Sequence, residues 1–343
     1  MIEGVSELIL ARARSNLQEN PFVPHSLLRW GHLQTIVGSQ QRRQFPWGWK
    51  NCSEEVLELG DGVKVKIRFR VTDSERPTLL AIHGMSGSSE SGYMLALSHK
   101  ASLRGWNFIL PSLYDVASDP EQPRIFHAGS SDYVSEILEI CTRQYSLKSI
   151  LLAGISMGGN ILMKLLGEWG HTVPSATMAA AVISPLVDLE SSWPLLDKPS
   201  NLLYRRYYLR RLRWLSMRRP TMMERFVSLE KLRRVNTIRE FDELVTAPLA
   251  GFDDAFHYYR EVSSSPLLGR IRVPTIILHS KDDPLLPWQP LTKEEVTSNE
   301  SLLIHLTQTG GHVAFIAREQ KKDIDRSWAE NRLIDFFGIA ADV

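Results

Sequence analysis

The sequence has little that would indicate a disulfide-bonded, metal-binding or membrane-spanning protein. Its two cysteines, Cys52 and Cys141, form no C-x-x-C pair, which favours a reducing compartment. No H-E-x-x-H pair, P-loop or G-x-G-x-x-G occurs, so we expect no metal and no nucleotide cofactor. The longest uncharged stretches, near Leu151 and Ala180, contain glycine or proline and indicate strands and turns rather than a spanning helix.

The sequence also lacks an excess of charge of either sign. The 40 Lys and Arg residues against 39 Asp and Glu give a formal net charge of +1, so any attraction to nucleic acid or membranes must come from a local patch. The first residues, M-I-E-G-V-S-E-L-I-L-A-R-A-R, contain acids early and no sustained apolar core, unlike a signal peptide. A chain of 343 residues can form one large α/β domain with an insertion, or two domains. We therefore expect a soluble, cytoplasmic protein.

One stretch, residues 149–166, organises the rest of the chain. An apolar run at 150–153 predicts a buried strand, and apolar residues at helical spacing follow from Asn160. Between them, G-I-S-M-G places Ser156 where a nucleophile elbow would hold it, with Gly154 and Gly158 supplying the room that such a sharp turn needs. The alternative is an ordinary strand-to-helix turn of a doubly wound sheet.

Strand and helix signals alternate along most of the chain, which predicts an α/β fold with helices on both faces of a mostly parallel sheet. Runs at 56–59 and 63–71, separated by Gly60-Asp61-Gly62, indicate an antiparallel hairpin. Further strands, all expected to be parallel, are predicted at 79–82, 107–110, 150–153, 178–183, 275–278 and 302–306, which makes an eight-stranded sheet. Helices are predicted at 93–103, 132–144, 160–169, 255–262, 291–297 and 323–337.

The pattern divides the chain into an arm, a core and a cap. Residues 1–50 are predicted to be an N-terminal arm packed on the core, and its first helix, over 1–20, would place Ile2, Val5, Leu8 and Ile9 on one face. Residues 51–188 and 251–343 would form the core. Strand signals stop between 189 and 250, after the sixth strand, where basic and aromatic helical sequence predicts a cap over the carboxyl edge of the sheet.

An activated serine needs a base and a group that orients the base. Asp282 and Asp283 follow the strand at 275–278, and His312 follows the strand at 302–306, in the order Ser, Asp, His that elbow-type enzymes use. We predict a catalytic triad of Ser156, Asp283 and His312. Asp282 and Asp188 are the alternatives for the acidic member.

The same enzymes need two backbone amides that stabilise an oxyanion. We predict that the amides of Met85, in the loop after the third strand, and Met157, at the start of the elbow helix, form this hole. His83, two residues before Met85, is more typical of a hydrogen-bonding structural residue than of a catalyst.

Residues 204–219, Y-R-R-Y-Y-L-R-R-L-R-W-L-S-M-R-R, contain seven arginines among aromatic residues and leucines. The simpler interpretation, which we prefer, is a cap helix whose basic face is only solvated. The alternative is a peripheral contact of the basic cap with an anionic lipid surface. We expect no nucleic-acid partner, because no recognised nucleic-acid-binding fold accompanies the patch.

Several motifs together resemble the YheT-like family of α/β-hydrolases, which is related to membrane-associated lipid hydrolases with this domain. They are P-F-V-P…G-H-L-Q-T-I-V-G (21–38), H-G-M-S-G-S-S-E-S-G-Y (83–93), R-I-F-H-A-G-S-S-D-Y (124–133), G-I-S-M-G-G-N (154–160), F-D-D-A-F-H-Y-Y-R-E-V-S-S (252–264), H-S-K-D-D-P (279–284) and G-G-H-V-A-F (310–315). The resemblance implies an α/β-hydrolase fold with a cap, and hydrolysis of short acyl or lipid esters by Ser156, Asp283 and His312. At residues 111–115 the chain has P-S-L-Y-D in place of the family's Asn-x-Arg-Gly, in a loop expected to border the pocket.

The predicted function is therefore that of a serine hydrolase acting on carboxylic esters, with a small-molecule ester or lipid as its partner and no cofactor. A thioesterase or amidase would use the same triad. A non-catalytic scaffold would also keep the fold, but it would tolerate the loss of a site residue, and here all are present.

Overall fold

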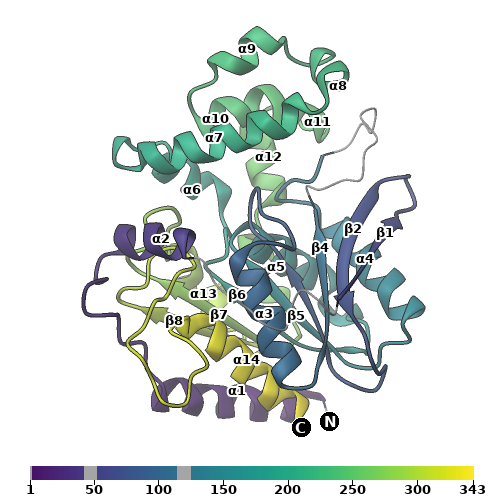
Figure 1. The fold of residues 1–343 in the computed structure, drawn as a ribbon, viewed down its shortest axis with the longest axis vertical. Coiled ribbons are helices and arrows are strands. Elements are labelled where there is room, and N and C mark those ends of the chain that lie inside the picture. The colour runs from purple at the N-terminus through teal and green to yellow at the C-terminus, as the bar shows by residue number, and fades with distance from the viewer. Residues whose placement is uncertain (1, 42–51, 114–124) are drawn as a thin grey trace.

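An eight-stranded sheet runs through the middle of the molecule, with helices on both of its faces (Figure 1). The computed structural model describes residues 2–41, 52–113 and 125–343 of the chain. The strands follow one another across the sheet in the order β1-β2-β4-β3-β5-β6-β7-β8. They are β1 (Ser53–Glu58), β2 (Lys64–Arg70), β3 (Thr78–Ile82), β4 (Asn107–Ser112), β5 (Ile150–Ile155), β6 (Thr177–Ile183), β7 (Thr275–Ser280) and β8 (Leu302–Thr307).

The predicted eight-stranded, mostly parallel sheet is confirmed, and each predicted strand overlaps an observed one. β1 and β2 form the expected antiparallel hairpin, whose turn contains Gly62 at a φ of 81°. β2 also pairs antiparallel with β4, so β2 alone runs against the others and β1 returns to their direction. From β4 to β8 every pairing is parallel, which brings the carboxyl ends of these strands to one edge of the sheet.

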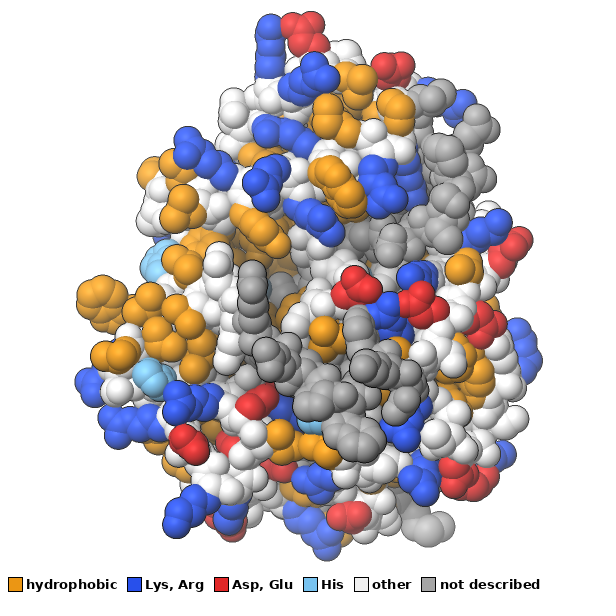
Figure 2. Space-filling model, viewed as in Figure 1, with side chains coloured by type: hydrophobic (Ala, Val, Ile, Leu, Met, Phe, Trp, Pro, Cys, Tyr) orange, Lys and Arg blue, Asp and Glu red, His pale blue; other side chains and the backbone are white. Residues whose placement is uncertain are grey.

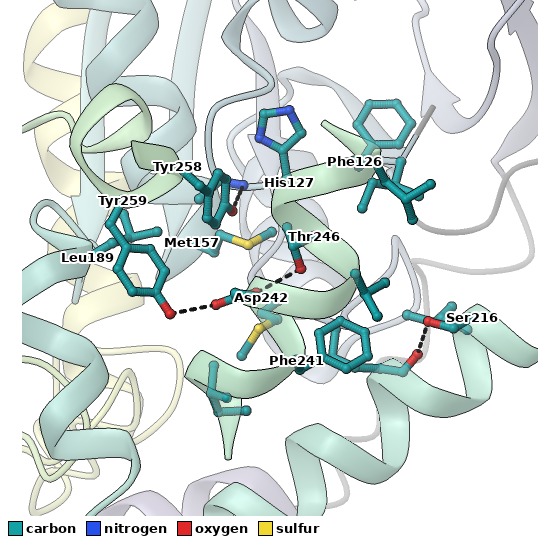
Figure 3. Close-up of a pocket in the computed structure, with 18 of the residues that line it drawn as sticks. Phe126, His127, Met157, Leu189, Ser216, Phe241, Asp242, Thr246, Tyr258 and Tyr259 are labelled. Carbon is teal, nitrogen blue, oxygen red and sulfur yellow. Dashed lines mark hydrogen bonds between the residues drawn. The ribbon is translucent and has the colours of Figure 1, made fainter. Parts of the chain in front are cut away.

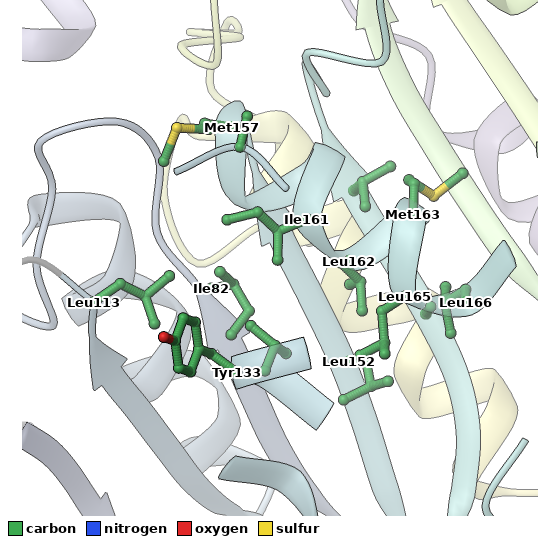
Figure 4. Packing of buried hydrophobic residues seen from close by; sticks show 14 of the residues in the cluster. Ile82, Leu113, Tyr133, Leu152, Met157, Ile161, Leu162, Met163, Leu165 and Leu166 are labelled. Atoms are coloured by element: carbon green, nitrogen blue, oxygen red, sulfur yellow. The ribbon is translucent and has the colours of Figure 1, made fainter. Parts of the chain in front are cut away.

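Two apolar layers hold the helices on the sheet. Side chains of a strand point alternately to its two faces, so Leu79 and Ala81 pack into one layer and Leu80 and Ile82 into the other. The first layer includes α1 (Ile2–Glu19), α3 (Gly92–Leu103) and α14 (Trp328–Ala341). The second, part of which Figure 4 shows around β5 and the elbow helix, includes α4 (Ser131–Gln144), α5 (Met157–Trp169), α12 (Ala255–Val262) and α13 (Glu294–Thr297).

Two helical predictions are wrong in detail. In α1, Val5 and Leu8 are each 43% exposed, and the buried face consists of Ile9, Leu10, Ala13 and Leu17, because the second half of the helix packs on α14. The last helix begins at Trp328 rather than at residue 323. Just before it, Ser327 forms an isolated antiparallel bridge with Ile316, and the Arg326 carbonyl accepts from the Ala317 amide at 2.8 Å, so the helix begins only after this pairing.

A group of short helices covers the carboxyl edge of the sheet, at the top of Figure 1, where the sequence predicts a cap. They are α6 (Leu189–Leu196), α7 (Leu202–Met217), α8 (Pro220–Glu224), α9 (Leu229–Arg234), α10 (Ile238–Phe241) and α11 (Ala247–Leu249), with a π-helical turn at Asp242–Thr246. These helices enclose an apolar cluster of their own. The limits of the cap at residues 189 and 250 stay a prediction.

The helix α2 (Gly31–Gln40) lies against the loops that follow β7 and β8. A Cβ at Gly31 would come within 1.9 Å of the Asp282 carbonyl oxygen, so only glycine allows this approach. The Gln34 side chain donates to the Ile316 carbonyl at 3.1 Å and accepts from the Ile316 amide at 2.7 Å. Residues 42–50 of the predicted arm lie outside the described ranges. In the described ranges, the helices are all too short or too polar to cross a bilayer.

Candidate active site

Ser156 occupies a sharp turn between β5 and α5. Its backbone has φ 55° and ψ −118°, a conformation that a residue with a side chain rarely adopts. A Cβ at Gly158 would lie 2.4 Å from the Ile82 carbonyl oxygen, and one at Gly154 would lie 2.7 Å from the Gly158 carbonyl oxygen. Glycine at these two positions therefore permits the elbow, as the sequence predicts.

Three loops at the carboxyl edge bring Ser156, His312 and Asp283 together. His312 Nε2 lies 2.9 Å from Ser156 Oγ, and His312 Nδ1 lies 2.8 Å from Asp283 Oδ2. The loops follow β5, β8 and β7, which end at the same edge because these strands are parallel. Gly311 allows the last loop to turn, with a φ of 64°. The three predicted residues thus form one hydrogen-bonded chain.

The Asp283 carboxylate is placed to orient the imidazole. Its side chain is fully buried, and its Oδ1 accepts from the amides of Leu285 and Leu286 at 2.8 and 3.1 Å. Burial alone would raise the pKa of this carboxyl, but the charge and hydrogen bond of His312 and the backbone amide outweigh it and lower the pKa. An ionised carboxylate only accepts hydrogen bonds, so His312 carries a proton on Nδ1 and offers Nε2 to the serine.

The two alternative aspartates lie elsewhere. Asp282 Oδ1 accepts from the Gly311 amide at 2.9 Å and from the Ser280 hydroxyl, so it holds the histidine loop rather than the histidine ring. Asp188 caps α6 by accepting from the Ser191 amide at 3.0 Å. Neither carboxylate takes the place beside the imidazole.

Met85 and Met157, the residues predicted to supply the oxyanion hole, flank the serine. Met157 begins α5, and Met85 lies in a turn closed by a 3.0 Å hydrogen bond from the Gly87 amide to the Gly84 carbonyl. A Cβ at Gly84 would lie 3.2 Å from Ser156 Cβ, so this turn passes close to the nucleophile. The residues predicted to form the hole are therefore near the position at which an ester carbonyl would be attacked.

His83 ties this turn to β4. Its Nε2 accepts from the Leu113 amide at 2.9 Å, and its Nδ1 lies 2.8 Å from the Gly84 carbonyl oxygen. Burial lowers the pKa of His83 to about 4, which keeps the ring neutral at physiological pH. These contacts support the structural role expected from the sequence.

Thr35 of α2 is a site residue that the sequence reasoning missed. Its hydroxyl oxygen accepts from the His312 amide at 2.9 Å, across 277 residues of sequence, and donates to the Gly31 carbonyl at 2.7 Å. A Cβ at Gly311 would lie 2.4 Å from that same carbonyl oxygen, so helix and loop are in close contact. The motif G-H-L-Q-T-I was visible in the sequence, but its pattern gives no sign of which distant loop it meets.

A cavity of about 280 Å³ lies between the elbow and the cap (Figure 3). Met85, Leu113 and Met157 line it from the core, and apolar side chains of the cap line it from above, among them Leu196, Leu212, Met223, Ile238 and Phe241. Of residues 111–115, predicted to be a loop, Pro111 and Ser112 instead belong to β4, Leu113 follows in a turn, and Tyr114 and Asp115 lie outside the described ranges. Met157, the residue after the predicted nucleophile, lines this largely apolar cavity.

Asp242 is an acidic residue on the wall of this cavity. Its carboxylate accepts from the Tyr259 hydroxyl at 2.9 Å and from the Thr246 hydroxyl at 2.7 Å (Figure 3). Burial raises the pKa of Asp242 to about 6, because an apolar environment disfavours the charged form. Since Tyr259 belongs to α12 and Asp242 to the cap, the pair joins cap to core.

Comparisons with known proteins agree with this architecture. A family model described as alpha/beta hydrolase fold matches residues 77–319. The Escherichia coli (strain K12) protein named "Putative esterase YheT" is 33% identical over 325 residues, which cover 92% of each chain. Human phospholipase ABHD3 is 28% identical over 296 residues, covering 83% of this chain and 71% of that protein. A monoacylglycerol lipase of Saccharomyces cerevisiae is 26% identical over 280 residues, covering 79% and 61%.

Solved structures show the same fold. The Pyrococcus furiosus esterase Pf2001 has a TM-score of 0.55 at 12% identity, covering 87% of this chain and 96% of that one. A membrane phospholipase A described as a bacterial virulence factor has a TM-score of 0.51 at 18% identity, covering 96% of both chains. The extent of the family match and of the likeness to YheT is decisive: this chain belongs to the α/β-hydrolase fold family, in the YheT-like group of esterases and lipases that its motifs resemble.

Proposed function

We propose that the chain is a serine hydrolase that cleaves carboxylic esters, with short-chain or lipid acyl groups, through an acyl-enzyme intermediate. The observation that carries the proposal is the hydrogen-bonded chain from Ser156 through His312 to Asp283, with distances of 2.9 and 2.8 Å. Such a chain supplies a nucleophile, a base and a group that orients the base.

In the proposed reaction, His312 Nε2 removes the proton of Ser156 as Oγ attacks the ester carbonyl carbon. The charge that develops on the carbonyl oxygen is stabilised by the amides of Met85 and Met157. When the C–O bond breaks, His312 gives its proton to the departing alcohol. Water, deprotonated by the same imidazole, then attacks the acyl-enzyme and releases the acid and the free serine. Asp283 stabilises the imidazolium in both halves of the cycle.

The cavity and the relatives support an ester with an apolar acyl group. Three relatives carry the names esterase, phospholipase and monoacylglycerol lipase, and all three names describe ester hydrolysis. The predicted peripheral contact of the basic segment 204–219 with a lipid surface belongs to this proposal, since esters of long acyl chains reside in membranes. Thioesters and amides would enter the same chemistry, and matched ester, thioester and amide substrates of one acyl group separate the three activities.

Replacing the nucleophile tests the proposal. Ser156→Ala is expected to abolish covalent labelling by a fluorophosphonate and hydrolysis of p-nitrophenyl esters, because no other group takes over the attack. Ser216→Ala is the matched control, since Ser216 also lines the cavity but donates its hydroxyl to the Leu212 carbonyl at 3.0 Å. Labelling that persists in Ser156→Ala would refute the assignment. Labelling of the intact protein without turnover of any ester, thioester or amide would favour the scaffold alternative.

A further inference from the structure

The outward face of α7 combines arginine with aromatic and apolar side chains. Its exposed residues recur at intervals of three and four, the spacing of one helix face, and they are Leu203, Arg206, Tyr207, Arg210, Arg211, Trp214, Met217 and Arg218. The guanidinium groups of Arg211 and Arg218 lie 4.5 and 4.9 Å from the centre of the Trp214 ring. The helix contains no acidic residue.

The outward side of α2 and the turn before it continue this character. Leu27 and Trp30 are each 77% exposed, and Leu33 and Ile36 follow on the helix at 38% and 39%. Large apolar side chains that are exposed singly are ordinary, but a contiguous group of them marks an interaction site. Figure 2 shows orange side chains gathered over α2 and, above them, blue side chains interspersed with orange over α7.

The two helices meet at one contact. The rings of His32 and Tyr204 stack with centroids 5.8 Å apart, and the Tyr204 hydroxyl donates to the His32 carbonyl at 3.3 Å. His32 lies within α2 and Tyr204 within α7, so the outward sides of both helices form one surface. We call this surface, made of the exposed residues of 27–36 and 203–218, the docking face.

The opposite sides of the same two helices face the active site. Leu212 and Leu215 of α7 line the cavity that Met157, next to Ser156, also lines, and Arg218 both lines the cavity and belongs to the docking face. In α2, the inward Thr35 holds the His312 loop. A molecule bound to the docking face would therefore lie at the rim of the cavity.

We propose that the docking face binds the surface of a bilayer that contains anionic lipids, so that ester substrates pass from the bilayer into the cavity. The inference rests on the proposed ester hydrolysis and names the place from which the substrate comes.

The positive charge of the docking face favours an anionic lipid surface over a protein as its partner. Over the described ranges, Arg206, Arg210 and Arg211 form no ion pair with an acidic side chain. Arginines that alternate with Trp, Tyr and Leu match the boundary between anionic headgroups and acyl chains, where the cations meet phosphates and the rings enter the interface. Each such cation strengthens binding to an anionic leaflet, although the whole chain is nearly neutral.

Vesicle sedimentation tests the proposal without involving catalysis. Ser156→Ala protein is mixed with vesicles of phosphatidylcholine, with or without phosphatidylglycerol, at increasing NaCl. We expect binding to the vesicles that contain phosphatidylglycerol, weakened by salt. Trp30→Ala, and separately Arg206→Gln with Arg210→Gln, are expected to weaken it roughly tenfold or more. Arg206→Lys with Arg210→Lys keeps the charges and should retain binding.

Control variants change an exposed apolar residue and an exposed arginine outside the docking face. Leu103→Ala at the end of α3, where the side chain is 59% exposed, and Arg143→Gln on α4, 73% exposed, are expected to leave binding unchanged. Melting temperatures of all variants verify that they fold. Three results would each overturn the proposal: no binding to anionic vesicles, equal losses in the controls, or self-association that Trp30→Ala abolishes.

Ester hydrolysis and binding of the docking face to a bilayer can be refuted independently of each other. Fluorophosphonate labelling of the wild type without vesicle binding would leave ester hydrolysis in place and overturn the docking face. Vesicle binding by a wild-type protein that neither labels nor hydrolyses would overturn ester hydrolysis and leave the docking face in place.

Discussion

At the scale of single residues, Asp283 is where burial and charge oppose each other most directly. A buried carboxyl would ordinarily take up a proton, yet this one is held ionised by His312 and by amides of its own loop. Its neighbour Asp282 shares the loop but binds backbone and a hydroxyl instead of the imidazole. Of these two adjacent aspartates, Asp283 thus orients the imidazole and Asp282 holds the loop that carries it.

Asp283→Asn is expected to reduce kcat by about 10³–10⁴, because an amide does not hold the imidazole in the required tautomer or stabilise its charged form. The measurement is kcat and KM with a soluble p-nitrophenyl ester. Asp282→Asn, whose amide oxygen can still accept from Gly311, should stay within about tenfold of the wild type. Equal losses in both variants would contradict the assignment of Asp283.

At the scale of elements, α2 contributes to the site from the far end of the sequence. It supports the His312 loop through the Thr35 hydroxyl and a close approach at Gly311, and it approaches the Asp282 loop at Gly31. A loop that carries a base must be held to a fraction of an ångström for the proton transfer to work. We therefore treat Thr35 as a positioning residue, which acts through the backbone of His312.

Thr35→Val keeps the shape of the side chain but leaves the buried His312 amide without its acceptor, at a cost of about 1–3 kcal/mol. We expect kcat to fall about tenfold with KM nearly unchanged, since the cavity is not altered. Thr35→Ser keeps the hydroxyl and should restore most of the activity. The comparison uses steady-state kinetics together with melting temperatures, and a fall in both variants alike would argue against this role.

The elements also show which features a sequence pattern can reveal. The sequence predicts the parallel strands because buried strands are continuous apolar runs, and it predicts Ser156, Asp283 and His312 because each lies in the loop after such a run. The buried face of α1 was assigned wrongly because Val5 and Leu8 share the helical period with Ile9, and only the position of α14 decides between the two faces. The sequence does not reveal the role of Thr35, because only the tertiary packing of α2 brings it to the His312 amide.

At the scale of the whole molecule, we expect stability to depend on pH through Asp242, which joins the cap to the core. Its pKa is raised from 3.8 to about 6 by burial, so the folded state binds this proton more tightly than the unfolded state. Between pH 4 and 6 the unfolded chain has lost the proton while the folded chain keeps it, and stability therefore falls as pH rises through this window. Above it, the charged carboxylate costs the fold at most about 3 kcal/mol.

Asp242→Asn removes this titration. We expect the variant to gain melting temperature relative to the wild type as pH rises from 4 to 6, with a constant difference at higher pH. Melting curves at closely spaced pH values measure the difference. A difference independent of pH would show that Asp242 is not the titrating group.

The cavity is formed by two separate parts of the chain. Its floor is made by loops at the sheet edge, and its roof by segments inserted between β6 and β7. The proposed reacting groups and most of the cavity roof are therefore encoded in different stretches of the gene. Natural variation in the roof can change which molecules fit while the chemistry beneath it is inherited intact, so relatives with the same floor need not share a preferred ester.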